Sequence, residues 1–231
     1  MFDLNAACGS QRNFVFLGEA GSGKSEIAVN MAIALAKHGK RSVHFFDLDM
    51  TKPLFRSRDI CQELTEKGIY VHYQEQFMDA PTLVGGVDRL LRDDNCYVVL
   101  DVGGDYIGAR SIGGYAPLLN QPSTAACYVV NSFRPWSLDL EHIDRVLGQI
   151  LGVSHIQIEQ LHFLGNPNLG PETTERDIEN GIQQLMDTVG TCVKIEGICV
   201  REDLYDSVET NQPLFPIQLY LTYPWNIGTV V

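Results

Sequence analysis

The sequence contains no run of Lys and Arg, and its 29 acidic residues outnumber its 17 basic ones. The formal net charge is therefore −12. A chain with this charge repels DNA, RNA and anionic lipid surfaces at long range. We therefore expect neither nucleic acid nor a membrane among its partners.

Long hydrophobic runs are also missing. No stretch reaches the roughly 18 apolar residues that would span a bilayer. The first residues lack the basic start and the long apolar stretch of a signal peptide. The late part of the chain carries no basic amphipathic helix of the kind that anchors to membranes. These absences lead us to expect a cytoplasmic protein.

Paired cysteines are absent too, since no two of the six cysteines form a CxxC or CxC motif. Cys96, Cys127 and Cys199 stand in strand-like runs, where a small buried thiol is the usual explanation. A metal or cluster site shared across a dimer stays open as an alternative, without support from the spacing. The six are Cys8, Cys61, Cys96, Cys127, Cys192 and Cys199.

Short apolar runs alternate with helical patterns along the chain. The runs are nearly continuous, which is typical of strands buried on both faces and hence of a mostly parallel sheet. With 231 residues, 45% of them hydrophobic, the chain suits a single domain spanning residues 1–231. The expected strands are Asn13–Leu17, Ser42–Phe46, Tyr97–Leu100, Ala126–Val130, Leu161–Leu164 and Ile195–Val200.

Apolar residues at helical spacing predict four helices between these strands. Gly39 ends the first helix, as a C-terminal glycine should, and Ser137 is the expected N-cap of the third. The C-terminal segment, with Pro213, Pro216 and Pro224, is expected to be irregular chain packed on the domain. The expected helices are Lys24–Lys37, Leu83–Arg92, Leu138–Leu151 and Glu172–Val189.

The segment Gly18–Ser25, GEAGSGKS, fits the phosphate-loop pattern G-x-x-x-x-G-K-[ST]. Glycines let successive backbone N–H groups turn inward around phosphate oxygens, and the positive end of the next helix adds to the attraction. Lys24 can reach the β- and γ-phosphates, and the Ser25 hydroxyl can bind Mg²⁺. The expected phosphate-binding residues are Gly18, Gly21, Ser22, Gly23, Lys24, Ser25 and Glu26.

The alternative for this segment is a glycine-rich turn between a strand and a helix that binds nothing. An apolar strand precedes the motif and an amphipathic helix follows it, which is the context that a phosphate loop requires. We therefore prefer phosphate binding. The expected fold class is α/β, a three-layer P-loop NTPase fold with a mostly parallel central sheet flanked by helices.

Aspartates follow two of the expected strands. Asp47 and Asp49 end one strand, and Asp101 ends another, with Gly104 close behind. Ligands of open α/β sheets bind beyond the carboxyl ends of the strands, where an Asp can hold Mg²⁺ directly or through water. Capping or turn formation is the alternative for Asp47 and Asp49. The upstream phosphate loop favours function for at least one of them, and Gly104 would let its amide approach the γ-phosphate.

The order of these motifs resembles the MinD/ParA-type ATPases, a group that includes the nitrogenase iron protein and the ATPase domains of bacterial tyrosine kinases. A phosphate loop is followed by D-x-D with a later Pro, and then by D-x-G-G-D. Asn131–Pro135 and Phe163–Pro167 stand where the family places base-contacting loops. Ile198–Pro213 resembles the family's late segment beyond the base, so the resemblance covers most of the chain.

The resemblance implies an ATP-dependent switch, in which two subunits face each other across two nucleotides and hydrolysis opens the pair. It implies ATP and Mg²⁺ as cofactors, a homodimer, and a protein partner of unknown identity. Asp49 would position or activate the attacking water, Asp47 would lie near Mg²⁺, and Asn166 would contact adenine. The expected metal-binding residues are Ser25, Asp47 and Asp101. The expected catalytic residues are Lys24, Asp49 and Asp101.

Two positions depart from the family pattern. The second residue of the family's loop is usually a Lys that reaches the partner's phosphates, and here it is Glu19. Because a triphosphate repels a carboxylate, we expect Glu19 to point to solvent, and Arg110 or Arg134 are candidate substitutes for the Lys. The iron protein's cluster-binding Cys corresponds to Gly108 here, which argues against such a cluster.

The sequence leaves three classes of function open. An ATPase switch for a partner protein is the first, and a small-molecule ligase or kinase of the dethiobiotin-synthetase type is the second. The third is a nucleotide-binding regulator with little turnover, which the change to Glu19 favours. The chain has no N-K-x-D motif, which many GTPases use to select guanine, so we expect ATP.

Overall fold

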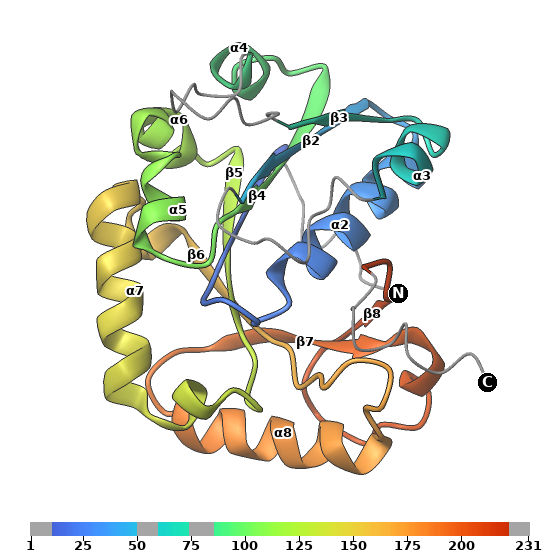
Figure 1. Cartoon of the computed structure of the whole chain (residues 1–231), viewed down its shortest axis with the longest axis vertical. Helices are drawn as coiled ribbons and strands as arrows, with labels where there is room; N and C mark the ends of the chain where they lie inside the picture. The colour runs from blue at the N-terminus through green and yellow to red at the C-terminus, as the bar shows by residue number, and fades with distance from the viewer. Residues whose placement is uncertain (1–10, 50–59, 74–85, 222–231) are drawn as a thin grey trace, which may run out of the picture.

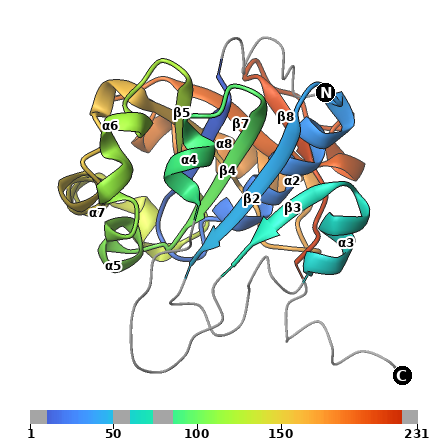
Figure 2. The same cartoon turned by 90° about the horizontal axis from the view of Figure 1, so that it is seen from above.

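A parallel β-sheet with helices on both faces forms the framework of the chain (Figures 1 and 2). The computed structural model describes residues 11–49, 60–73 and 86–221. Within these ranges every strand pairing is parallel, and the strand order is β3-β2-β4-β1-β5-β6-β7-β8. The predicted three-layer α/β fold is therefore confirmed. The strands are β1 Asn13–Leu17, β2 Ser42–Leu48, β3 Ile69–His72, β4 Cys96–Val102, β5 Thr124–Val130, β6 Leu161–Gly165, β7 Ile195–Arg201 and β8 Leu214–Ile217.

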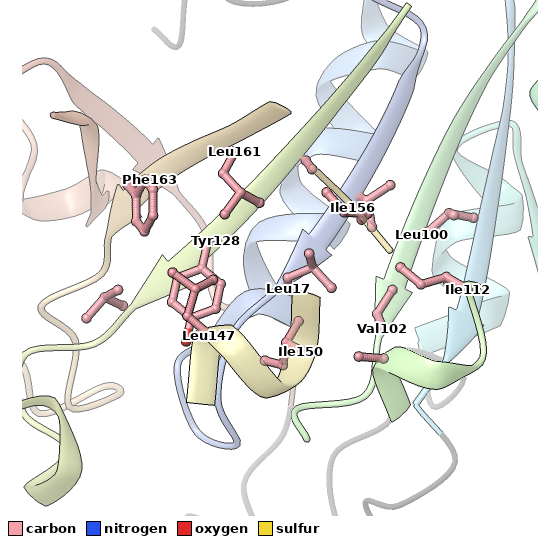
Figure 3. Packing of buried hydrophobic residues seen from close by; sticks show 14 of the residues in the cluster. Leu17, Leu100, Val102, Ile112, Tyr128, Leu147, Ile150, Ile156, Leu161 and Phe163 are labelled. Carbon is pink, nitrogen blue, oxygen red and sulfur yellow. The ribbon is translucent and has the colours of Figure 1, made fainter. Parts of the chain in front are cut away.

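The sheet separates two hydrophobic clusters, because side chains alternate between its faces along each strand. Val15 and Leu17 of β1 face a cluster with α4 to α8, part of which is shown in Figure 3. Phe14 and Phe16 face the other cluster, with α2 and α3. The helices are α2 Lys24–His38, α3 Cys61–Glu66, α4 Val87–Leu91, α5 Tyr106–Arg110, α6 Ala116–Leu119, α7 Leu140–Ser154 and α8 Glu175–Thr188.

The six expected strands are all present, and β1 has its expected bounds. Two further strands, β3 and β8, were not expected. The prediction of an irregular C-terminal segment is wrong at Leu214–Ile217, because β8 pairs with β7 there. Of the predictions above, those that concern Cys8, Pro53, Pro224 and residues 83–85 lie outside the described residues.

Two helices begin later than the apolar pattern indicates. Ser137 is not an N-cap, because it lies in the short 3-10 helix Pro135–Leu138. Asp139 caps α7 instead, and its carboxylate accepts a hydrogen bond from Glu141 N at 3.0 Å. Helix α8 begins at Glu175 behind Thr174, which forms a capping box with Asp177. Apolar spacing marks the buried face of a helix, whereas the capping side chain decides where the helix starts.

The buried-thiol prediction is confirmed for Cys96, Cys127 and Cys199. Burial raises the pKa of the Cys199 thiol to about 12, so this sulfur stays protonated at neutral pH. Among the described residues, no helix has both the length and the apolar character that a membrane span requires.

Two glycines allow the segment after β4 to fold back onto the end of that strand. A Cβ atom on Gly108 would lie 2.4 Å from Gly103 Cα, and one on Gly103 would lie 2.8 Å from Gly108 Cα. Real Cβ atoms do not approach backbone this closely, so α5 can fold back on the end of β4 only with glycine at both places. Two glycines of Gly103–Gly114 therefore permit close packing.

We expect Gly108→Ala to lower the free energy of unfolding by about 1–3 kcal/mol, because the added methyl group forces the two segments apart. Gly114→Ala is the matched control, since a Cβ there meets nothing within 4 Å. That control should stay within about 0.5 kcal/mol of the parent protein. Urea unfolding followed by circular dichroism measures both. Equal stabilities for the two variants would contradict the packing role of Gly108.

Candidate functional site

The phosphate-loop motif forms the turn between β1 and α2, at the carboxyl end of a central strand (Figure 1). Three of its residues have left-handed or related backbone angles, with φ of 137° at Gly18, 80° at Gly21 and 89° at Gly23. L side chains rarely adopt such angles. The loop conformation therefore requires the glycines that the motif supplies.

Residues of and beyond the neighbouring strands also pack closely against the loop. A Cβ on Gly18 would lie 2.5 Å from the Val129 carbonyl oxygen of β5. One on Gly23 would lie 2.0 Å from Asn166 Nδ2, just beyond β6. Gly23 is the N-cap of α2 and offers no side chain to the first-turn amides. A phosphate at this helix end would receive those amides and the favourable end of the helix dipole.

Lys24 lies in the first turn of α2 with its side chain fully buried. Its Nζ is 3.6 Å from Asp49 Oδ2, and the two side chains are 0% and 2% exposed. A buried ammonium group is costly unless carboxylates or phosphates accompany it. The pair therefore places a cation and a carboxylate together beside the loop.

Two further carboxylates lie at the same edge of the sheet. Asp47 of β2 and Asp101 of β4 are register partners on neighbouring strands. The Ser25 hydroxyl donates a hydrogen bond to Asp101 Oδ1 at 3.1 Å, and Asp49 N donates to Asp47 Oδ1 at 3.1 Å. The structure thus brings together the predicted residues Lys24, Ser25, Asp47, Asp49 and Asp101.

This donor set fits Mg²⁺, which prefers a few protein oxygens and completes its shell with water and phosphate. The available oxygens are the Ser25 hydroxyl and the carboxylates of Asp47 and Asp101. In the described part of the chain, no group of three or more His, Cys, Asp or Glu could hold a metal ion. The Ser25 hydroxyl and the two carboxylates therefore fit an ion that a phosphate chain also binds.

Gly104 lies directly against the phosphate loop. A Cβ on Gly104 would lie 2.7 Å from Ala20 N and 2.8 Å from Ala20 Cα. Asp105 then caps α5, accepting a hydrogen bond from Gly108 N at 2.7 Å. The D-x-G-G-D segment therefore connects the Asp101 carboxylate to the loop and to α5. The predicted contact between Gly104 and the γ-phosphate would form where this segment meets the loop.

Asparagines at the ends of β5 and β6 lie on the other side of the phosphate loop from the strand-end aspartates. Asn166 Nδ2 donates to Ser22 O at 2.7 Å, and Asn131 Nδ2 donates to Asn168 O at 2.8 Å. Within the described residues, the buried Asn166 Oδ1 and Ser22 Oγ have no hydrogen-bond partner. Buried polar atoms are usually paired, so these two indicate a polar ligand. Asn166 braces the loop through its amide group, and its oxygen is the part available for the predicted adenine contact.

Glu26 directs its side chain away from the loop toward the C-terminal segment. Its carboxylate accepts hydrogen bonds from the amides of Tyr220 and Leu221, the latter at 3.3 Å. Burial raises the pKa of this carboxyl to about 7, against the lowering effect of the two amides, and Asp101 adds to the rise. The backbone N–H of Glu26 is therefore the group available for its predicted phosphate contact.

Glu19 does not simply point to solvent, so that prediction is wrong. Its side chain is 26% exposed, and Oε1 lies 3.0 Å from His142 Nε2 on α7. Arg134, one of the two candidate substitutes for the missing Lys, donates from Nε to Gly21 O at 2.9 Å. Arg110, the other candidate, is exposed at the end of α5. The sequence did not indicate the contacts of His142 and Arg134, because both join segments that are distant along the chain.

Several solved structures resemble this chain at low sequence identity. The GDP complex of the signal recognition particle 54 kDa protein from Aeropyrum pernix K1 is 14% identical, with a TM-score of 0.49, and the match covers 82% of this chain and 41% of that one. FtsY from Thermotoga maritima is 16% identical, with a TM-score of 0.48 and coverage of 82% and 62%. FlhF complexed with GTP and Mg²⁺ is 12% identical, with a TM-score of 0.49 and coverage of 80% and 63%.

This chain thus spans less than two thirds of the length of each of these three proteins. Among curated proteins, none is significantly similar in sequence. A family model does match, over residues 14–214, which includes the phosphate loop, the strand-end aspartates and both asparagine loops. The chain therefore belongs to the CobQ/CobB/MinD/ParA nucleotide-binding domain family.

Proposed function

We propose that this protein binds ATP with Mg²⁺, hydrolyses it slowly, and acts as a nucleotide-dependent dimer switch for a partner protein. One observation carries the proposal. A phosphate loop whose conformation requires glycine lies beside a buried cation and the carboxylates at the ends of two strands. Lys24 Nζ lies 3.6 Å from Asp49, and Ser25 Oγ lies 3.1 Å from Asp101. Phosphate-loop hydrolases use these residue types for positioning and charge stabilisation.

Each residue has a role that its position supports. The loop amides and Lys24 bind the phosphate chain, and Ser25, Asp47 and Asp101 hold Mg²⁺. The bound Mg²⁺ would neutralise charge on the phosphates. Asp49, buried beside Lys24, orients the attacking water, and Gly104 brings its amide toward the γ-phosphate. We assign ATP rather than GTP because the chain has no N-K-x-D motif.

The proposal of a dimer and of a protein partner rests on family membership. In a switch of this kind, two subunits meet across the nucleotide face and separate after hydrolysis. Glu19 favours a second candidate function, a nucleotide-binding regulator with little turnover, because it stands where the family usually places a Lys. A regulator of this type would bind ATP without releasing phosphate.

Replacing Lys24 with Ala should abolish tight binding of ATP and Mg²⁺. Hydrogen bonds to charged groups contribute about 1.5–3 kcal/mol each, so losing two weakens binding roughly a hundredfold or more. Isothermal titration calorimetry measures the affinity, and circular dichroism checks the fold. Lys37→Ala, at the exposed end of the same helix, is the control and should bind normally. Unchanged affinity in Lys24→Ala would rule out the assigned site.

Replacing Asp49 with Ala should leave ATP binding in place and lower turnover. Positioned acid–base groups contribute roughly 10²–10⁴-fold to rate, and we expect a loss in that range. Phosphate release and calorimetry on the same preparation separate the two effects. Asp187→Ala, an exposed site on α8, is the control. Normal turnover in Asp49→Ala would reject its assigned role.

A dimeric active form predicts that the ATPase rate per subunit rises with protein concentration and then levels off. The reason is mass action, since more of the chain is paired at higher concentration. Phosphate release measured across a wide concentration range, with sedimentation in parallel, tests this. A rate per subunit that is flat throughout, in a protein that sediments as a monomer, would remove the dimer from the proposal.

A further inference from the structure

The rim of the phosphate loop carries one guanidinium group and one carboxylate. Arg134, which follows β5, donates from Nε to Gly21 O at 2.9 Å. A Cβ on Gly21 would lie 3.0 Å from Arg134 Nε and 3.2 Å from Cζ, so the guanidinium covers this part of the loop. Glu19, Ser22 and Arg134 line the same small hollow. The charge that a phosphate chain meets here depends on how these two side chains are held.

The carboxylate is held by a chain of side chains from α7. Arg145 Nη2 lies 2.7 Å from His142 Nδ1. A guanidinium can only donate, so Nδ1 accepts and the imidazole proton is on Nε2. Nε2 then donates to Glu19, with distances of 3.0 Å to Oε1 and 3.2 Å to Oε2. The His142 imidazole thus ties the loop's carboxylate to α7.

The guanidinium charge is not needed to brace the loop. A neutral amide, Asn131 Nδ2, already approaches the same Gly21 carbonyl at 3.5 Å. Among the described residues, the bond to Gly21 O is the only hydrogen bond of the Arg134 side chain. Further N–H groups of this permanently charged guanidinium therefore remain at the rim. These groups have the geometry and charge that phosphate oxygens attract.

We propose that Arg134 is a phosphate-binding residue acting within its own subunit, and that Arg145 and His142 position Glu19 so that its charge stays away from the bound phosphates. This inference rests on the proposed nucleotide binding. The effect is greater for ATP than for ADP, because the triphosphate carries additional negative charge. The loop thereby obtains a cation at its rim without a lysine in the loop's second position.

Substitutions at Arg134 separate charge from bracing. Arg134→Gln keeps an N–H donor but removes the charge, so ATP affinity should fall about tenfold while ADP affinity changes little. Its ATP affinity should also depend less on salt. Arg134→Lys, which retains the charge, should recover most of the loss. Arg89→Gln, at an exposed position on α4, is the matched control and should bind both nucleotides as the parent does.

Substitutions at Glu19 and His142 form a double-mutant cycle. His142→Ala releases the carboxylate and should weaken ATP binding about threefold to tenfold, through charge repulsion. In a Glu19→Gln background the same substitution should have no effect, because no charge remains to be repelled. Equal losses in both backgrounds would show that His142 acts only through the fold and would overturn its positioning role.

Calorimetry with Mg·ATP and Mg·ADP on all variants, each checked by circular dichroism, gives the decisive readings. An ATP-to-ADP affinity ratio in Arg134→Gln equal to that of the parent overturns the phosphate role of Arg134 while leaving the proposed function intact. Absence of binding by the parent protein itself overturns both proposals. A reduced ratio that Arg134→Lys restores supports the inference.

Discussion

The backbone conformation of the phosphate loop is the constraint on which the rest of the site depends. Gly18, Gly21 and Gly23 take angles that L side chains rarely adopt, and the carbonyl of Val129 and the amide of Asn166 leave no room for a Cβ on two of them. The loop is therefore set both by its own glycines and by the strands beside it. A loop preformed in this way loses little conformational freedom when it binds phosphate.

Parallel strands end at one edge of the sheet, and this explains why the charged residues converge. Asp47 and Asp101 lie in two neighbouring strands, and Asp49 directly follows one of them. Lys24 comes from the helix that packs on these strands. Burying several carboxylates together is costly unless cations accompany them. Lys24 supplies one positive charge, and a Mg²⁺ ion held with a phosphate chain would supply more. The site is thus consistent with polyphosphate chemistry and poorly suited to an uncharged ligand.

Much of this arrangement follows from local patterns in the sequence. The loop, the long strands and the helices α7 and α8 all carry strong signals, either a motif or an apolar repeat. Strands β3 and β8 have only four residues each, and β8 contains Pro216, so a sequence pattern does not reveal them. The start of α7 was misplaced because Pro135 begins a separate 3-10 turn ahead of Asp139.

The sequence by itself determined the phosphate loop, the strand-end aspartates and the alternation of strand and helix, because each depends on residues that are close along the chain. Only the tertiary structure decided that Arg134 covers Gly21, that His142 holds Glu19, and that Glu26 binds the amides of the C-terminal segment. These pairs are separated by 113, 123 and 194 positions. No local propensity encodes such contacts, since they exist only once the sheet has brought the ends of its strands together.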